Sequence, residues 1–143
     1  MSLYQKRPAT DFLVVHCTAT PEGKEFHASD IDRIHRQIGW NGIGYHYIIT
    51  LDGKVEPGRP EDVIGAHVEG FNSRSIGISY IGGVDAKMKA KDTRTPEQKV
   101  AIRKLLQELR KRYPKAKIQG HRDFPNVHKD CPCFNAIPEY ADI

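Results

Sequence analysis

Hydrophobic residues occur along the chain in short runs that are separated by turn-forming residues. Such runs cover about residues 11–17, 45–50 and 75–81, and a weaker one lies around residues 117–119. The run at 45–50 is rich in aromatic and β-branched residues, and the pattern predicts a strand at each of the four segments. Asp52-Gly53 is a strong hairpin signal, and it predicts a further strand at 54–56 that pairs with the strand at 45–50.

A first helix is predicted over residues 28–39. Ile31, Ile34 and Ile38 recur at helical spacing there, Ser29 or a neighbour can serve as the N-cap, and Gly39 ends the helix.

The longest predicted helix begins at Thr95-Pro96-Glu97-Gln98, which combines a capping box with a proline at the first helical position. Tyr113-Pro114 ends it. The polar stretch 84–94 before it is predicted to be a surface loop, and residues 134–141 a last short helix. The apolar face of the long helix is predicted to consist of Val100, Ile102, Leu105, Leu106 and Leu109.

Strands interleaved with helices, together with one hairpin, predict an α/β fold with a mixed β-sheet covered by helices. The chain has 143 residues, of which 38% are hydrophobic, so we expect residues 1–143 to form a single domain with its own core. No apolar run approaches the roughly 20 residues of a membrane helix, and residues 1–8 lack the apolar segment of a secretory signal. We therefore expect that the protein is synthesised in the cytoplasm and does not insert into a membrane.

The net positive charge of the chain does not by itself indicate that it binds nucleic acid. A net charge of +4 favours anionic surfaces in general, such as cell-wall polymers. The basic residues of segment 103–112 alternate with the apolar stripe of the long helix, which is typical of a solvated helix face. We expect no nucleic-acid partner.

Candidate chemistry is concentrated near the C-terminus, in Gly120-His121-Arg122-Asp123 and Lys129-Asp130-Cys131-Pro132. Histidine and cysteine are the preferred zinc ligands, and His16, at the end of the first predicted strand, offers a third. Three protein ligands leave one position open, which is typical of a catalytic zinc site. His16 and His121 lie far apart in the sequence, so the fold must bring them together.

Two further cysteines compete for the ligand role. Cys17 follows His16 on a strand, so its side chain should point to the opposite face and act as a small buried hydrophobe. Cys133 lies two residues after Cys131, and a structural zinc that uses both thiols is an alternative. Three cysteines without an export signal predict reduced thiols rather than a disulfide framework.

The other histidines carry weaker signals. His67 lies in a glycine-rich loop, where it is either a binding residue or a solvated one. His35 should lie at the inner edge of the first helix, and His27 and His128 are predicted to be ordinary surface residues.

Six separated motifs resemble, in order and approximate spacing, the zinc amidases of the phage lysozyme type. These enzymes belong with the type-2 N-acetylmuramoyl-L-alanine amidases and the peptidoglycan recognition proteins. The resemblance covers about residues 11–134. The motifs are Val15-His16-Cys17-Thr18-Ala19-Thr20, Gly44-Tyr45-His46-Tyr47, Asp52-Gly53, Gly65-Ala66-His67, Ser75-Ile76-Gly77, and Gly120-His121-Arg122-Asp123 with Lys129-Asp130-Cys131-Pro132.

This resemblance implies a central mixed sheet flanked by helices, and one Zn²⁺ per chain in a surface groove that receives peptidoglycan or a muropeptide. The metal ligands fall on His16, His121 and Cys131. Tyr45 and Lys129 match active-site residues, and His67 matches a histidine of the substrate groove. The implied reaction is hydrolysis of the amide between N-acetylmuramic acid and L-alanine by a monomeric enzyme. No acidic pair stands out for glycoside hydrolysis.

Several roles remain open at this point. The leading hypothesis is a phage or prophage endolysin that reaches the cell wall after release from the cytoplasm. A cytosolic amidase that recycles cell-wall fragments, a non-catalytic peptidoglycan-binding module and a regulator of another protein are alternatives. Binding-only relatives typically lack the cysteine ligand, so Cys131 favours catalysis over binding alone.

Overall fold

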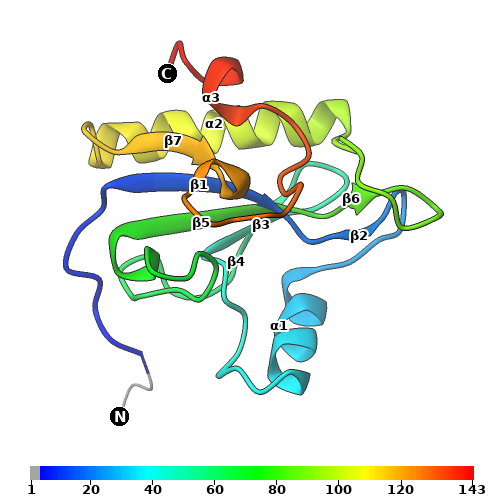
Figure 1. Ribbon diagram of the computed structural model, residues 1–143, viewed down its shortest axis with the longest axis horizontal. Helices are drawn as coiled ribbons and strands as arrows, with labels where there is room; N and C mark the ends of the chain where they lie inside the picture. Colours follow the sequence, from blue (N-terminus) through cyan, green and yellow to red (C-terminus); the bar gives the residue numbers. More distant parts are fainter. Residues whose placement is uncertain (1–3) are drawn as a thin grey trace.

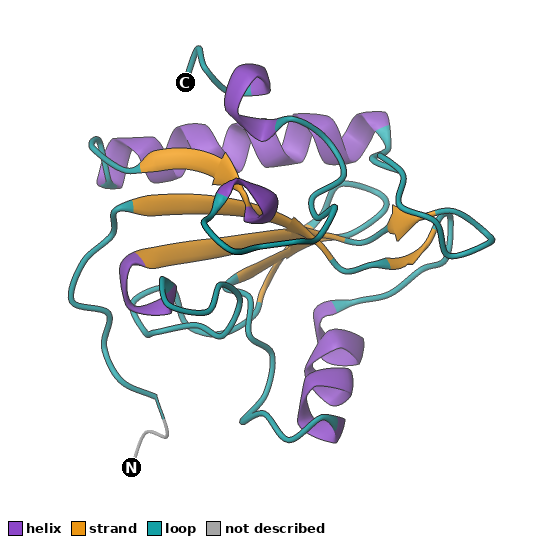
Figure 2. Cartoon of the chain, viewed as in Figure 1, coloured by secondary structure: helices purple, strands orange, loops and turns teal. Residues whose placement is uncertain are grey.

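A computed structural model describes residues 4–143 and shows a five-stranded sheet in the order β4–β3–β5–β1–β7 (Figures 1 and 2). Only β4 runs antiparallel to its neighbour, β3, and the other neighbouring pairs are parallel. The predicted mixed sheet is therefore confirmed. The strands are β1 (Phe12–Cys17), β3 (Tyr47–Ile49), β4 (Val55–Pro57), β5 (Ser75–Tyr80) and β7 (Lys117–Gly120).

Helices cover both faces of this sheet (Figure 1). The long helix α2 (Pro96–Arg112) and the short α3 (Ala136–Glu139) lie on one side, and α1 (Ala28–Gln37) lies on the other. Two 3₁₀ turns, η1 (Asn72–Arg74) and η2 (His121–Asp123), flank β5 and β7. A small parallel sheet of β2 (Thr20–Pro21) and β6 (Gly83–Val84) was not predicted, because two-residue strands leave no periodic signal.

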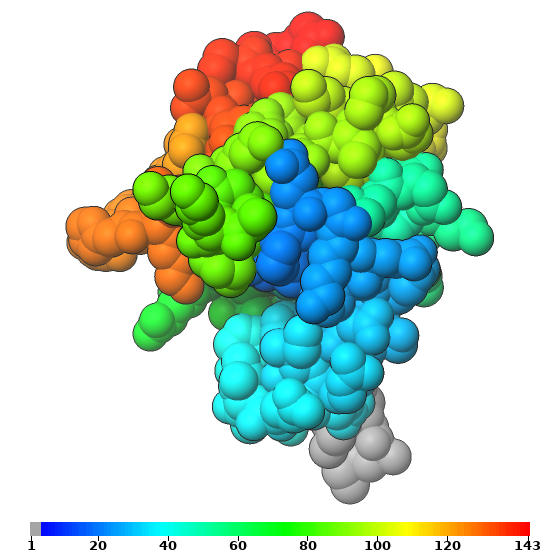
Figure 3. Space-filling view, turned by 90° about the vertical axis from the view of Figure 1, so that its right-hand side faces the viewer, coloured from blue at the N-terminus to red at the C-terminus, as the bar shows by residue number. Residues whose placement is uncertain are grey.

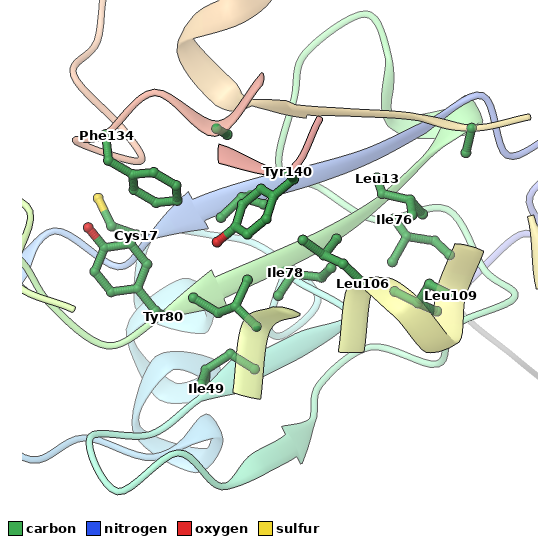
Figure 4. Close-up of a cluster of buried hydrophobic side chains, with 14 residues drawn as sticks. Leu13, Cys17, Ile49, Ile76, Ile78, Tyr80, Leu106, Leu109, Phe134 and Tyr140 are labelled. Atoms are coloured by element: carbon green, nitrogen blue, oxygen red, sulfur yellow. The ribbon is translucent and has the colours of Figure 1, made fainter. Parts of the chain in front are cut away.

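The main core lies between the sheet and α2 (Figure 4). Alternate residues of each strand face it, as the two-residue period of a strand requires. Cys17 belongs to this core and is 5% exposed, as expected for a small buried hydrophobe. The core includes Leu13, Val15 and Cys17 of β1, Ile76, Ile78 and Tyr80 of β5, and Ile102, Leu106 and Leu109 of α2.

The opposite face of β5 carries only small residues. Ser75, Gly77 and Ser79 alternate with the core residues of that strand, and both serines are fully buried. His16 pairs in register with Ser79 on the parallel strand β1, so their side chains share this face. The small side chains on this face of β5 leave room for the imidazole rings of neighbouring histidines, such as His16.

The predicted boundaries hold to within a few residues, with two corrections near α1 and β3. The N-cap of α1 is His27 rather than Ser29, and its backbone N–H donates to Asp30 Oδ2 at 2.8 Å. His27 lies at the surface as predicted, with a side chain that is 44% exposed, and its Nδ1 lies 2.9 Å from Glu56 Oε2. The strand predicted at 45–50 covers only Tyr47–Ile49, because the chain bends at residue 46.

Two other predictions need correction around α2. Val100 is 55% exposed and does not join the core, although the capping box of Thr95 and Gln98 forms as predicted. The stretch 84–94 does not lie wholly at the surface. Its last residue, Arg94, has a side chain that is 3% exposed, because it pairs with Asp92 and Glu139. Charged residues can be buried when they are paired, and the composition of a loop does not reveal the partner.

Within residues 4–143, no helix is both long enough and apolar enough to cross a membrane.

Candidate metal centre and groove

His16 and His121 meet because they end neighbouring parallel strands. Val15 of β1 pairs with Gly120 of β7, so the residues that follow, His16 and His121, lie side by side. Their ring centroids are 4.7 Å apart. In α/β sheets, ligands bind at the carboxyl ends of parallel strands, which is where both histidines are placed.

The Gly120–Asp123 motif brings Cys131 to the same place. A Cβ on Gly120 would lie 2.6 Å from Pro132 Cδ, so only glycine lets the segment after Cys131 pack this closely. Arg122 donates its backbone N–H to the Cys131 carbonyl at 2.9 Å, and Gly120 donates its own to Asp123 Oδ2 at 2.8 Å. The motif therefore supplies one ligand and also holds the loop that supplies another.

The ligand atoms of His16, His121 and Cys131 all lie within 4.8 Å of one another. Cys131 Sγ is 3.7 Å from His16 Nδ1. Zinc–nitrogen and zinc–sulfur bonds of about 2.1 and 2.3 Å at a tetrahedral angle require a separation of about 3.6 Å. The donor set and its spacing fit zinc, so these residues form a possible His-His-Cys metal site.

The three thiols are free; those of Cys17 and Cys133 face each other, whereas that of Cys131 faces His16. Cys133 Sγ lies 3.2 Å from the Gly83 carbonyl and 3.9 Å from Cys17 Sγ, on the core side of β1. Cys131 Sγ instead accepts the backbone N–H of Cys17 at 3.2 Å and faces His16. This geometry supports Cys131 rather than Cys133 as the ligand.

Burial keeps the two histidines neutral, which is the form that binds a metal. Burial lowers the pKa of His121 to about 4, and the Lys129 ammonium lowers it further. Burial also lowers the pKa of His16 well below its usual value, with contributions from His67, His121 and Lys129. Lys129 therefore lies close enough to act on both histidines.

Tyr45 lies in the loop before β3, and its ring is 5.1 Å from that of His16. Burial raises the pKa of its phenol above the usual value, and the Cys131 thiol adds to that shift. The phenol is therefore protonated at neutral pH and can donate a hydrogen bond.

A groove of about 900 Å³ opens at this site and is lined by residues 66–72 and 125–129 together with Trp40 and His121. Both Lys129 and His67 line it, so the structure brings all six of the predicted site residues to one place. The segment around residues 124–130 projects from the body of the molecule and forms one wall (Figure 3). His128 belongs to this wall, which the sequence did not indicate.

His67 is less accessible than a solvated loop residue, with 8% exposure. Its ring nitrogens lie 2.9 Å from His16 Nε2 and 3.3 Å from Ser75 Oγ. Any contact with a molecule in the groove would therefore involve the carbon edge of the ring.

A second groove of about 670 Å³ lies between the β3–β4 hairpin and α2. Its lining includes Val55, Val100 and Leu105, and it contains neither histidine nor cysteine. The chemistry of the chain is therefore concentrated in the first groove.

Sequence reasoning missed the residues that support the site. His46 is 1% exposed; its Nε2 donates to the Val63 carbonyl at 2.8 Å, and its Nδ1 accepts the Gly77 N–H at 3.0 Å. The alternation in Ser75-Ile76-Gly77-Ile78-Ser79 was the available signal. A strand with small residues at every second position predicts a large neighbour on that face.

An α/β sheet that brings three candidate metal ligands together next to a groove is typical of a metal-dependent hydrolase. Comparison with known proteins gives the family. The Amidase_2 family model, described as N-acetylmuramoyl-L-alanine amidase, matches residues 5–134. The chain belongs to this family, which confirms the resemblance predicted from the sequence.

Individual relatives agree with that assignment. The chain is 42% identical over 132 residues to an endolysin of Enterobacteria phage K11, covering 92% of this chain and 86% of the relative. It is similar to the structure of N-acetylmuramoyl-L-alanine amidase LysC from Clostridium intestinale, with 30% identity, a TM-score of 0.80, and coverage of 96% and 86%. A Drosophila PGRP-LB mutant in complex with tracheal cytotoxin is 25% identical, with a TM-score of 0.78 and coverage of 96% and 84%. The α/β fold class and the expectation of an amidase are thus confirmed.

Proposed function

We propose that this chain is a zinc-dependent N-acetylmuramoyl-L-alanine amidase that cleaves peptidoglycan as an endolysin. The observation that carries the proposal is the convergence of His16, His121 and Cys131, with ligand atoms within 4.8 Å of one another, next to a groove that His121 lines. The family membership supplies the reaction, and the K11 relative, named as an endolysin, supports the biological role.

His16, His121 and Cys131 would hold the metal next to the groove, which His121 lines. A zinc ion there would supply hydroxide at neutral pH and polarise the scissile carbonyl. The protein side chains then have to stabilise the charge that develops as the amide is attacked.

Lys129 would stabilise the oxyanion of the tetrahedral intermediate. Lys129 lines the groove together with His121, and its charge lowers the pKa of both His16 and His121, which supports this role. Tyr45, whose phenol is protonated at neutral pH, would donate a hydrogen bond to the attacking oxygen or to the oxyanion. We assign both residues to catalysis and His67 to the groove wall.

Peptidoglycan is the proposed partner. The groove of about 900 Å³ is large enough for part of a muropeptide, and it combines Trp40 and Phe71 with Glu69 and Lys129. Such a mixture of apolar and polar groups is typical of a ligand site. The related PGRP-LB structure, which contains a bound tracheal cytotoxin, supports a substrate of this class.

The identity of the cleaved bond tests this proposal. Purified protein is incubated with intact peptidoglycan and, separately, with a soluble muropeptide, and new L-alanine amino termini and new reducing sugar ends are both assayed. We expect amino termini without reducing ends, from both substrates. New reducing ends would mean glycoside cleavage, binding without release would favour the non-catalytic alternative, and cleavage of the soluble fragment alone would favour recycling.

A further inference from the structure

His67 is held in a slot built for its ring. A Cβ on Gly77 would lie 2.6 Å from His67 Cγ, and one on Gly65 would lie 2.8 Å from His67 Cδ2, so both neighbours must lack a side chain. The backbone N–H groups of His67 and Val68 both donate to Asn72 Oδ1 at 2.8 Å. Ring and backbone are therefore fixed before anything enters the groove.

His16, His67 and Ser75 form a series of hydrogen bonds that ends at the Phe71 carbonyl, and this carbonyl determines which ring nitrogens carry protons. The Ser75 hydroxyl donates to the Phe71 carbonyl at 2.9 Å, and a carbonyl can only accept. Ser75 Oγ, 3.3 Å from His67 Nε2, must then accept a hydrogen bond from the N–H of that nitrogen.

A neutral His67 with its proton on Nε2 has a bare Nδ1, which accepts from His16 Nε2 at 2.9 Å. His16 in turn carries its own proton on Nε2. Its bare Nδ1 is the atom that faces Cys131 Sγ, 3.7 Å away.

We propose that His67 is a positioning residue for the metal centre, which accepts the Nε2–H of His16 and thereby holds His16 Nδ1 in the ligand position. This inference rests on the metal centre proposed above. Hydrogen bonds to the second ring nitrogen of a ligand histidine fix its tautomer and orientation, and their loss typically weakens metal binding 10- to 100-fold. Because its nitrogens are occupied and its side chain is buried, His67 acts on His16 more directly than on substrate.

Two substitutions separate orientation from packing. In His67→Phe the ring stays but the acceptor is lost, so zinc affinity should fall about 10- to 100-fold. In His67→Asn the amide oxygen takes the place of Nδ1, so affinity should stay within a few-fold of the original. Zinc affinity is measured by competition with a chelator, and unfolding curves confirm that each variant is folded. Equal affinity of His67→Phe and the original protein, or an equal loss in both variants, would overturn the proposal.

A measurement on the unsubstituted, metal-free protein provides an independent readout. Proton–nitrogen correlation spectra of the imidazole rings report which nitrogen carries the proton. We expect Nε2–H on both His16 and His67, and an Nδ1–H on His16 would overturn the proposal. If the original protein binds no zinc at all, the proposed function fails. If it binds zinc and only the His67 predictions fail, the positioning role alone is rejected.

Discussion

Replacing Cys131 by serine should abolish zinc-dependent activity, whereas replacing Cys133 by serine should leave it intact. A serine hydroxyl stays protonated at neutral pH and is a poor zinc ligand. Four-ligand zinc sites contribute about 10–16 kcal/mol, or roughly 2.5–4 kcal/mol per ligand, so Cys131→Ser should weaken zinc binding on the order of 100- to 1,000-fold. Metal content by elemental analysis and release of L-alanine amino termini measure the two effects.

Cys133→Ser is the matched control, because the same atom is exchanged only two residues away. Cys133 Sγ faces the Gly83 carbonyl at 3.2 Å and Cys17 Sγ at 3.9 Å, and a serine hydroxyl can still donate to that carbonyl. Equal losses of zinc in the two variants would contradict the assignment and would favour a site that uses both thiols.

Replacing Lys129 by methionine should lower kcat roughly 100-fold with little change in zinc content. Methionine keeps the length of the side chain and removes the charge that would stabilise the oxyanion. Loss of one such donor costs about 100- to 1,000-fold in rate, and the lower end applies because Lys129 is exposed in the free protein. Steady-state kinetics on a soluble muropeptide measures the effect.

Two comparisons sharpen the Lys129 prediction. Lys117→Met removes the same charge from β7, an exposed position at the opposite end of that strand from His121, and should leave kcat unchanged. Lys129→Arg keeps a cation in the groove and should retain more activity than Lys129→Met. A rise in KM with unchanged kcat in Lys129→Met would instead assign Lys129 to substrate binding.

The sequence was sufficient to predict the sheet because its strands differ so clearly from their surroundings. β1 and β5 are nearly continuous runs of buried residues, as expected of central parallel strands, and Asp52-Gly53 fixed the hairpin. The prediction was weakest where tertiary contacts determine whether a side chain is buried. Arg94 is buried because it pairs with Asp92 in the same loop and with Glu139 of α3, and no local pattern reveals the distant partner Glu139.

In the candidate site, too, the sequence indicated residue types but not the tertiary contacts between them. Residue chemistry alone indicated His16, His121 and Cys131, but a spacing of more than a hundred residues between the histidines hid their contact. The parallel register of Val15 with Gly120 supplies that contact. The role of His67 was hidden for a different reason. Its partners are a histidine and a serine on two other strands, His16 and Ser75, and a glycine-rich loop in sequence looks solvated.

Reconstitution with zinc tests the central claim most directly. The protein is stripped with a chelator, zinc is added back in steps, and release of L-alanine amino termini from a muropeptide is followed at each step. The His16, His121 and Cys131 centre predicts no activity in the stripped protein and full recovery at one zinc per chain. Full activity in the stripped protein, or recovery that requires two zinc ions per chain, would contradict it.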